Sequence, residues 1–270
     1  MLKCEMMQER SDLQRKHIGR RIWHYTSLDS TNAVAVALPP DPGNHGLVIL
    51  ADEQKAGRGQ YGRHWLSPPG SSVLMSVVLH PPPEMLKPAL LCAWAAVSVA
   101  EVVLGVTGRQ ARIKWPNDVL LQRRKIAGIL IEQGRSTVIG IGLNVTQSAA
   151  DFERAGLPLA GSLTSVTGQE FEIGKIISSL IERLDSEYDD LLRGEIAALE
   201  SRWQWRVGLL GREVIAIDSG STTYRGRLRD MTFAGIDLEC AGGRKLLQPE
   251  IVRQLLPAET AAEELGANNS

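Results

Sequence analysis

The sequence predicts an α+β fold in which a β-sheet with covering helices is followed by a small β-barrel-like module. Three patterns carry this prediction. Apolar β-like runs separated by glycine- and proline-rich loops recur between Ile22 and Val145. Apolar residues then recur at helical spacing over 173–193, and after Gly211 the apolar period changes to two. The helix is therefore expected to cover one face of the sheet, and the alternating segments are expected to form the barrel.

The N-terminal part contains a polar lead-in, a first helix and the first strands. Residues 1–20 form the lead-in. The Ser, Asp, Thr and Asn residues of 27–32 precede an Ala- and Val-rich run at 33–38, a pattern typical of a helix N-cap. Capping alone explains these hydroxyls, although a helix N-terminus also presents free N–H groups to an anion or a carbonyl. The expected strands here are Ile22–Tyr25, 47–51 and 73–79.

The segment from Pro88 to Val106 is almost wholly apolar and long enough to span a bilayer. It contains Ser98 and Glu101, is rich in small Ala and Val, and has no flanking pattern of basic residues. A buried helix of a globular domain is therefore the favoured interpretation. Gly105 and Gly108 are expected to close this helix.

The remaining elements follow from short apolar runs and turn residues. Glycines inside the expected strands at 125–132 and 137–145 mark either close approach of a ligand or packing under a helix; they are Gly128, Gly140 and Gly142. A further helix is expected at 195–205. The expected strands of the terminal module are 214–217, 223–228, 236–238 and 245–247. Residues 258–270 are rich in Ala, Glu and Asn and are expected to form a flexible tail.

Composition limits the class of protein. With 270 residues, 43% of them apolar, the chain suits one large domain or a large and a small one. Lys and Arg total 30 against 31 Asp and Glu, and this near-neutral balance argues against a general nucleic-acid binder. Cys4, Cys92 and Cys240 match no metal-binding spacing and indicate plain thiols in a reducing compartment. The charged N-terminus lacks the apolar core of a secretory signal.

The segment from Gln54 to Trp65 contains glycines and basic residues but no carboxylate and no apolar face. It is expected to be a mobile surface loop between two strands. Its glycines permit positive φ and close approach to a ligand, whereas Arg58 and Arg63 suit carboxylate or phosphate. Trp65 offers a flat face on which a ring can stack. On these residues alone, a ligand-gripping loop and a solvated basic hairpin are both open interpretations.

A second dense cluster runs from Arg112 to Leu121. Pro116 biases Trp115 toward an extended conformation, so Lys114 is expected at the end of a strand. Asn117 and Asp118 are turn residues before the next run, and Arg123–Arg124 is the expected hairpin tip. By spacing alone, a surface lysine at a strand edge is the favoured interpretation of Lys114.

Together these motifs resemble the biotin protein ligases. The likeness extends from about Trp23 through the terminal module and implies a mixed sheet with helices, similar to class II aminoacyl-tRNA synthetases, over 21–207. It implies an SH3-like domain over 208–257 and, with only 1–20 ahead of the catalytic part, the single-function type without an N-terminal DNA-binding domain. Four matches in the family's order carry the resemblance: Ser30-Thr31-Asn32; Gly57-Arg58-Gly59-x-x-Gly62-Arg63-x-Trp65; Lys114-Trp115-Pro116-Asn117-Asp118 with Lys125-x-Ala127-Gly128-Ile129; and Gly140-Ile141-Gly142-Leu143-Asn144-Val145.

The resemblance implies a two-step reaction with biotin and ATP as substrates and Mg²⁺ bound with the nucleotide. The biotin carboxylate attacks the α-phosphate, giving biotinyl-5′-AMP and pyrophosphate, and a lysine amine of a biotin carboxyl carrier domain then displaces AMP. Two anions meet in the first step, so Arg58 and Lys114 are the implied catalytic residues. The implied biotin-binding residues are Ser30, Thr31, Asn32, Gln54, Gly57, Arg58, Gly59, Gln60, Lys114 and Gly128. The implied nucleotide-binding residues are Arg58, Arg63, Trp65, Lys125 and Asn144, with Trp65 stacked on adenine once the loop closes and Asn144 on an adenine nitrogen.

One position departs from the family pattern, because Gln60 stands where an arginine is common. The loss of a cation predicts weaker retention of the adenylate and leakage of activated biotin. The expected partner is the carrier domain of a biotin-dependent carboxylase, with no DNA and no membrane, in a cytoplasmic enzyme for which a homodimer is open. Three alternatives stay open: a lipoate or octanoate ligase of the same fold, a non-catalytic nucleic-acid-binding module, and a pseudo-enzyme with a regulatory function.

Overall fold

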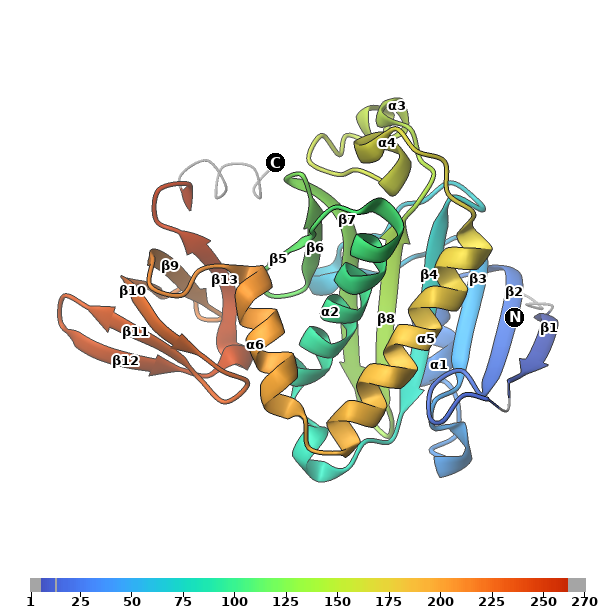
Figure 1. Cartoon of the computed structure of the whole chain (residues 1–270), viewed down its shortest axis with the longest axis horizontal. Coiled ribbons are helices and arrows are strands. Elements are labelled where there is room, and N and C mark those ends of the chain that lie inside the picture. Colours follow the sequence, from blue (N-terminus) through green and yellow to red (C-terminus); the bar gives the residue numbers. More distant parts are fainter. Residues whose placement is uncertain (1–5, 13, 262–270) are drawn as a thin grey trace.

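The computed structural model describes residues 6–12 and 14–261, and within them the chain forms two β-sheets (Figure 1). The larger sheet has eight strands in the order β1-β2-β3-β4-β8-β7-β6-β5. β2 and β3 run parallel, and the other neighbours run antiparallel. The expected mixed sheet is therefore confirmed. Its strands are β1 (Met6–Ser11), β2 (Arg21–Leu28), β3 (Val48–Gln54), β4 (Ser72–Leu79), β5 (Arg112–Lys114), β6 (Asp118–Leu121), β7 (Arg124–Gln133) and β8 (Thr137–Asn144).

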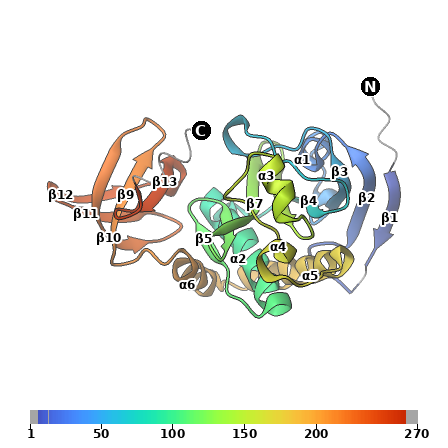
Figure 2. The ribbon, with the colours of Figure 1, turned by 90° about the horizontal axis from the view of Figure 1, so that it is seen from above.

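Helices cover both faces of the large sheet (Figures 1 and 2). On one face α2 (Pro88–Thr107) packs on β6, β7 and β8, α5 (Ile173–Leu192) packs on α2 and β4, and α6 (Ile196–Val207) packs on α2 and β5. On the other face α1 (Thr31–Val36) contacts β3, β4 and β8. Although α2 is apolar and long enough to cross a membrane, 67% of its most apolar window is buried in the protein. The buried-helix interpretation of this segment is confirmed.

The two faces of β7 and β8 differ in composition. Ile129, Ile139 and Ile141 belong to the main core that α2 covers. The alternate positions carry Gly128, Gly140 and Gly142. Because successive side chains of a strand point to opposite faces, the glycines open the face on which α1 lies.

The smaller sheet has five antiparallel strands in the order β12-β11-β10-β9-β13 and lies beside α6 (Figure 2). Trp115 Nε1 donates to the carbonyl of Val252 at 2.8 Å, and the rings of Trp203 and Phe233 lie 5.1 Å apart. These contacts fix the small sheet against the large one. Its strands are β9 (Glu213–Asp218), β10 (Thr223–Met231), β11 (Ile236–Cys240), β12 (Gly243–Leu247) and β13 (Val252–Pro257).

Several elements differ from the sequence-based expectations. The lead-in 1–20 contains β1, which pairs with β2 and extends the sheet. Gly108 closes α2 at φ 66, but Gly105 lies inside that helix. The hairpin tip lies at 122–123, one residue earlier than expected. Elements not predicted are α3 (Ala149–Arg154), α4 (Leu163–Thr167), β13 and four short 3₁₀ turns: η1 (Pro42–Asn44), η2 (Gln60–Gly62), η3 (Pro83–Met85) and η4 (Pro249–Ile251).

The expected tail begins as ordered structure. Ala261 is buried at 2% exposure, and Arg212 forms an ion pair with Glu259. Residues 258–261 are therefore packed onto the small sheet, and the rest of the expected tail, 262–270, lies outside the described residues.

Candidate active site

Strand register places four residues of the matched motifs in one row, among them Lys114 and Gly128 of the predicted site. Lys114 pairs with Asp118, Asp118 with Gly128, and Gly128 with Gly142. Directly paired residues of antiparallel strands project to the same face. Lys114 is the last residue of β5, as expected, and its side chain shares a face with the two glycines. We call these four residues the floor row.

Lys125 joins the floor row through an ion pair. Its Nζ lies 2.6 Å from Asp118 Oδ1, and the pairing of β6 with β7 is irregular between Val119 and Leu120. A β-bulge of this kind redirects the side chains of a strand. A methyl group placed on Gly128 would lie 3.5 Å from Lys125 Cε, which confirms that the two share a face.

Residues 54–65, hereafter the flap, form a short hairpin over this face. The backbone N–H of Gly59 donates to Arg63 at 2.7 Å, and that of Trp65 donates to Gly57 at 2.9 Å. At the tip, Tyr61 has a φ of 57° and is 63% exposed. The flap therefore has defined backbone contacts at its base, whereas the Tyr61 side chain at its tip is largely exposed.

The indole of Trp65 lies on the glycines of the floor row. A methyl group on Gly142 would lie 2.5 Å from Trp65 Cε2, and one on Gly128 would lie 3.1 Å from Cζ3. The ammonium of Lys125 lies 5.9 Å from the ring centroid. Glycine is required here because the indole occupies the space of a side chain, so the flap already contacts the floor. Trp65 Nε1 is buried and has no hydrogen-bond partner among the described residues, and a buried N–H of this kind calls for an acceptor.

A continuous polar network underlies the other end of the flap. Arg58 Nη2 and Asn32 Nδ2 both donate to Glu132 Oε2, at 2.9 and 2.8 Å. Ser76 Oγ lies 2.5 Å from Asn32 Oδ1 and 2.7 Å from Thr31 Oγ1. Thr31 in turn donates through its N–H (2.7 Å) and its hydroxyl (3.0 Å) to Gln54 Oε1. The network thus connects the predicted biotin residues to the flap arginine.

The network includes two residues that sequence reasoning did not assign to the site, Ser76 and Glu132. Ser76 lies at the buried centre of β4 between apolar neighbours, and Glu132 lies near the end of β7 after the apolar run 129–131. A polar residue in the buried middle of a strand needs a hydrogen-bond partner. This pattern is the sequence signal that could have assigned Ser76 to the site.

The remaining predicted residues are placed as follows. Ser30 is the N-cap of α1 and accepts from Ala33 N–H at 3.4 Å, so its capping role is confirmed. A methyl group on Gly57 would lie 2.5 Å from the carbonyl of Trp65, whereas Gln60 begins the turn at the flap tip. A cavity of about 340 Å³ opens beneath the flap. It is lined by Arg58, Gly59, Gly62, Arg63, His64, Leu130 and Glu132.

Asn144 lies two residues beyond Gly142 and is 4% exposed. Its Nδ2 donates to the carbonyl of Gly161 at 2.9 Å, and its Oδ1 accepts from Gln147 Nε2 at 3.1 Å. Nδ2 carries a second N–H, which none of these hydrogen bonds uses and which is the donor available to an adenine nitrogen.

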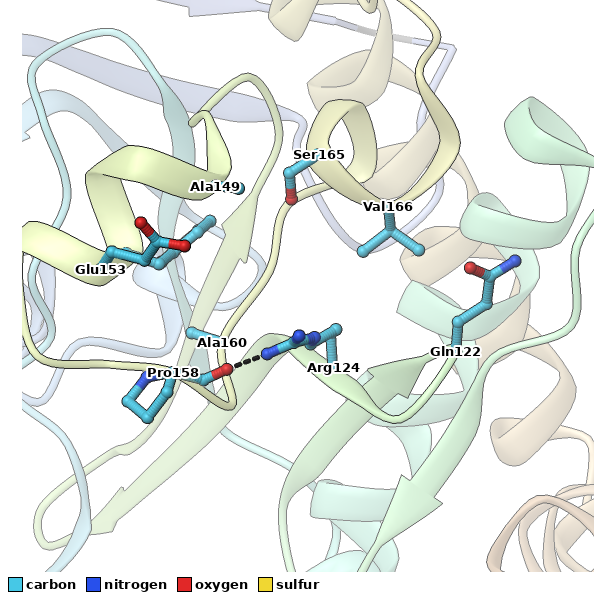
Figure 3. Close-up of a pocket in the computed structure, with 9 residues that line it drawn as sticks. Gln122, Arg124, Ala149, Glu153, Pro158, Ala160, Ser165 and Val166 are labelled. Carbon is cyan, nitrogen blue, oxygen red and sulfur yellow. Dashed lines mark hydrogen bonds between the residues drawn. The ribbon is translucent and has the colours of Figure 1, made fainter.

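Another cavity, of about 360 Å³, lies between α3, α4 and the start of β7 (Figure 3). Arg124 points across it and donates to the carbonyl of Pro158. The predicted site residues are absent from its lining, so volume alone does not locate the site.

The described residues hold no group of three or more His, Cys, Asp or Glu side chains suited to a metal ion. The carboxylates near the flap, Asp118 and Glu132, are already paired with cations. Burial raises the pKa of the Cys92 thiol to about 12, so it stays protonated and is no nucleophile.

Comparisons with known proteins place the chain in a class. The Biotin/lipoate A/B protein ligase family matches residues 19–146, which include the flap and the floor row. The chain is 33% identical over 242 residues to the biotin--[acetyl-CoA-carboxylase] ligase of Paracoccus denitrificans, covering 85% of this chain and 95% of that protein. It is 32% identical over 221 residues to the bifunctional ligase/repressor BirA of Bacillus subtilis, covering 80% and 68%.

A solved structure shares the fold. The biotin protein ligase of Aquifex aeolicus in complex with biotin and ATP superposes with a TM-score of 0.74 at 24% identity, covering 87% of this chain and 97% of that one. The chain belongs to the biotin protein ligases, and the resemblance drawn from its motifs is confirmed.

Proposed function

We propose that this chain is an ATP-dependent biotin protein ligase. It forms biotinyl-5′-AMP and transfers biotin to a lysine of a biotin carboxyl carrier domain. The observation that carries the proposal is that two cations of the floor row, Lys114 and Lys125, share a sheet face with the overlying flap, which carries Arg58. Such a site suits a reaction in which two anions must be held in contact.

In the first step the biotin carboxylate attacks the α-phosphate, the bond from α-phosphorus to the bridging oxygen breaks, and pyrophosphate leaves. Lys114 bridges the carboxylate and an α-phosphate oxygen, and its position at a strand end fixes the ammonium between them. Arg58 grips phosphate from the flap through its planar fork. In the second step the neutral lysine amine attacks the carbonyl carbon of the mixed anhydride, the bond from that carbon to the phosphate oxygen breaks, AMP leaves, and the nitrogen loses a proton to solvent as the amide forms.

The polar network binds the ureido head of biotin. Thr31 and Gln54 fix each other's orientation, which leaves the amide NH2 of Gln54 to contact the ligand. Because the side chain is already ordered, binding costs little conformational entropy. Ser30, Asn32 and, from the flap tip, Gln60 are further proposed biotin contacts, and Gly57 and Gly59 allow the backbone to approach the ligand. A buried polar group of biotin left unmatched would cost about 1–3 kcal/mol.

The nucleotide end lies toward Trp65 and Lys125. Trp65 stacks on adenine with the ring face turned away from the glycines, and its indole N–H gains an acceptor. Arg63 and Lys125 contact phosphates. Flap closure excludes water, which protects the anhydride from hydrolysis.

We also propose the types of the two domains, the acceptor of biotin and the compartment of the reaction. Residues 21–207 form a catalytic domain of the class II aminoacyl-tRNA synthetase type, and 208–257 form an SH3-like domain. The acceptor is the carrier domain of a biotin-dependent carboxylase, and the reaction takes place in the cytoplasm.

The direct test mixes the protein with biotin and MgATP and measures pyrophosphate. Release that depends on biotin, followed by biotinylation of an added carrier domain, is the expected result. Lipoate and octanoate serve as matched carboxylic acids, because the matching family includes lipoate ligases. Pyrophosphate release with lipoate but not biotin would replace this function by the lipoate alternative.

A further inference from the structure

Glu132 lies under the flap near the end of β7, and one of its oxygens receives two hydrogen bonds. Arg58 Nη2 donates to Oε2 at 2.9 Å and Asn32 Nδ2 donates to the same atom at 2.8 Å. The Glu132 side chain is 28% exposed and that of Arg58 is 43% exposed. The residue proposed to grip phosphate is thus already held by an anion of the protein.

The second hydrogen bond ties Glu132 to a rigid part of the site. Asn32 is 3% exposed, and a methyl group on Gly140 would lie 2.3 Å from its Oδ1. Its Oδ1 is also 2.5 Å from Ser76 Oγ. Because Asn32 has no room to move, it fixes the carboxylate, and the carboxylate fixes the position that Arg58 occupies above the 340 Å³ cavity.

We propose that Glu132 is a positioning residue that latches the flap before nucleotide binds and transfers Arg58 to the phosphate when it does. This proposal rests on the proposed function, because it takes a nucleotide phosphate as the competing anion. A guanidinium has five N–H donors and exchanges one oxyanion for another without losing its charge partner. The half-exposed Arg58–Glu132 pair is weak enough for a phosphate to displace it.

The latch has a consequence for affinity. While Arg58 is bound to Glu132, the phosphate must compete for it, so the pair lowers the affinity for ATP. Glu132→Gln keeps an acceptor for Asn32 but removes the charge. We expect the dissociation constant for ATP alone, without biotin, to fall by about two- to fivefold in this variant.

The test has a part that needs no ligand. Trypsin cleaves after Arg58 and Arg63, and Glu132→Gln is expected to speed this cleavage in the ligand-free protein because the flap is no longer held down. Glu239→Gln is the matched control, because Glu239 forms an ion pair with Arg229 on the small sheet. It removes one negative charge, as Glu132→Gln does, but away from the flap. Equal flap cleavage in Glu132→Gln and in the control would overturn the latch.

A double-mutant cycle separates the latch from bulk charge. ATP binding is measured for Glu132→Gln with Arg58 intact and with Arg58→Gln. Tightening only with Arg58 intact supports the latch, and equal tightening in both backgrounds, or weaker binding with Arg58 intact, overturns it. If the unmodified protein binds no ATP and releases no pyrophosphate, the proposed function fails, and the cleavage experiment with inorganic pyrophosphate as the competing anion decides the latch separately.

Discussion

The floor row and the flap each position a cation, but the floor row does so rigidly and the flap does so through few contacts. In the floor row, register fixes Lys114, Asp118, Gly128 and Gly142 through the hydrogen bonds of four adjacent strands. The flap holds its arginine on a two-rung hairpin, through one half-exposed ion pair. The difference indicates a division of labour. In the proposed function, the floor row sets the geometry of the reacting atoms, whereas the flap sets how tightly and how long the nucleotide is held.

The sharpest test of this division is Lys114→Ala, which we expect to have the largest effect. Loss of a charge aimed at the reacting oxygens is expected to slow adenylate formation by ~100- to 1000-fold. The rate is measured as biotin-dependent pyrophosphate release in a single turnover. Lys114→Arg restores the charge but not the compact ammonium, so it should rescue binding of ATP more than rate. A Lys114→Ala enzyme with normal pyrophosphate release would contradict a catalytic floor.

Arg58→Ala tests the flap side of the comparison. A phosphate contact from a charged donor predicts that affinity for ATP and retention of the adenylate fall by about 10- to 100-fold. The ligand-free melting temperature should change little, because a half-exposed ion pair adds at most about 1 kcal/mol. Equilibrium binding and thermal unfolding without ligand measure the two effects. A large drop in ligand-free melting temperature with unchanged ATP affinity would make Arg58 a structural residue.

Gly142→Ala tests where the flap and the floor meet. The new methyl group would lie 2.5 Å from Trp65 Cε2, so the indole must leave the floor. Loss of an ordered stacking face predicts about tenfold weaker ATP binding. Gly134→Ala is the matched control, because nothing lies within 4 Å of a methyl group there. Equal ATP affinities of the two variants would show that the indole position does not matter for the nucleotide.

The sequence predicted the floor better than the supports of the flap. Motif spacing placed Lys114 at a strand end and Gly128, Gly140 and Gly142 on adjacent strands, because period and turn residues are local signals. It did not predict Glu132 as the partner of Arg58, since the two are 74 residues apart and only the assembled sheet brings them together. Nor did it predict β1 or β13, whose pairing depends on partners elsewhere in the chain.

The contact between the small sheet and the flap also joins residues far apart in the sequence, so the sequence did not predict it. One hypothesis for the C-terminal module is that it helps to close the site, and truncation near Gly208 is the simplest test of it. The structure argues against that experiment, because removal of Val252 and Phe233 would strip partners from Trp115 and Trp203. A single contact offers a cleaner probe. Arg253 of β13 lies 5.0 Å above the ring of Tyr61 at the flap tip.

This contact predicts the smallest effect. An exposed cation–π pair contributes about 0.5–1 kcal/mol, which corresponds to about two- to fivefold faster loss of the bound adenylate in Arg253→Ala. Tyr61→Leu should have a similar effect, and the double variant should add nothing further, because both remove one contact. Arg225→Ala, at an exposed position of β10, controls for charge on the same sheet. If the effects of Arg253→Ala and Tyr61→Leu on the logarithm of the adenylate dissociation rate add in the double variant, the small sheet does not hold the flap through this pair. Non-additive rates would extend the comparison to a third region, in which the small sheet sets how long the flap stays closed while the floor still sets the chemistry.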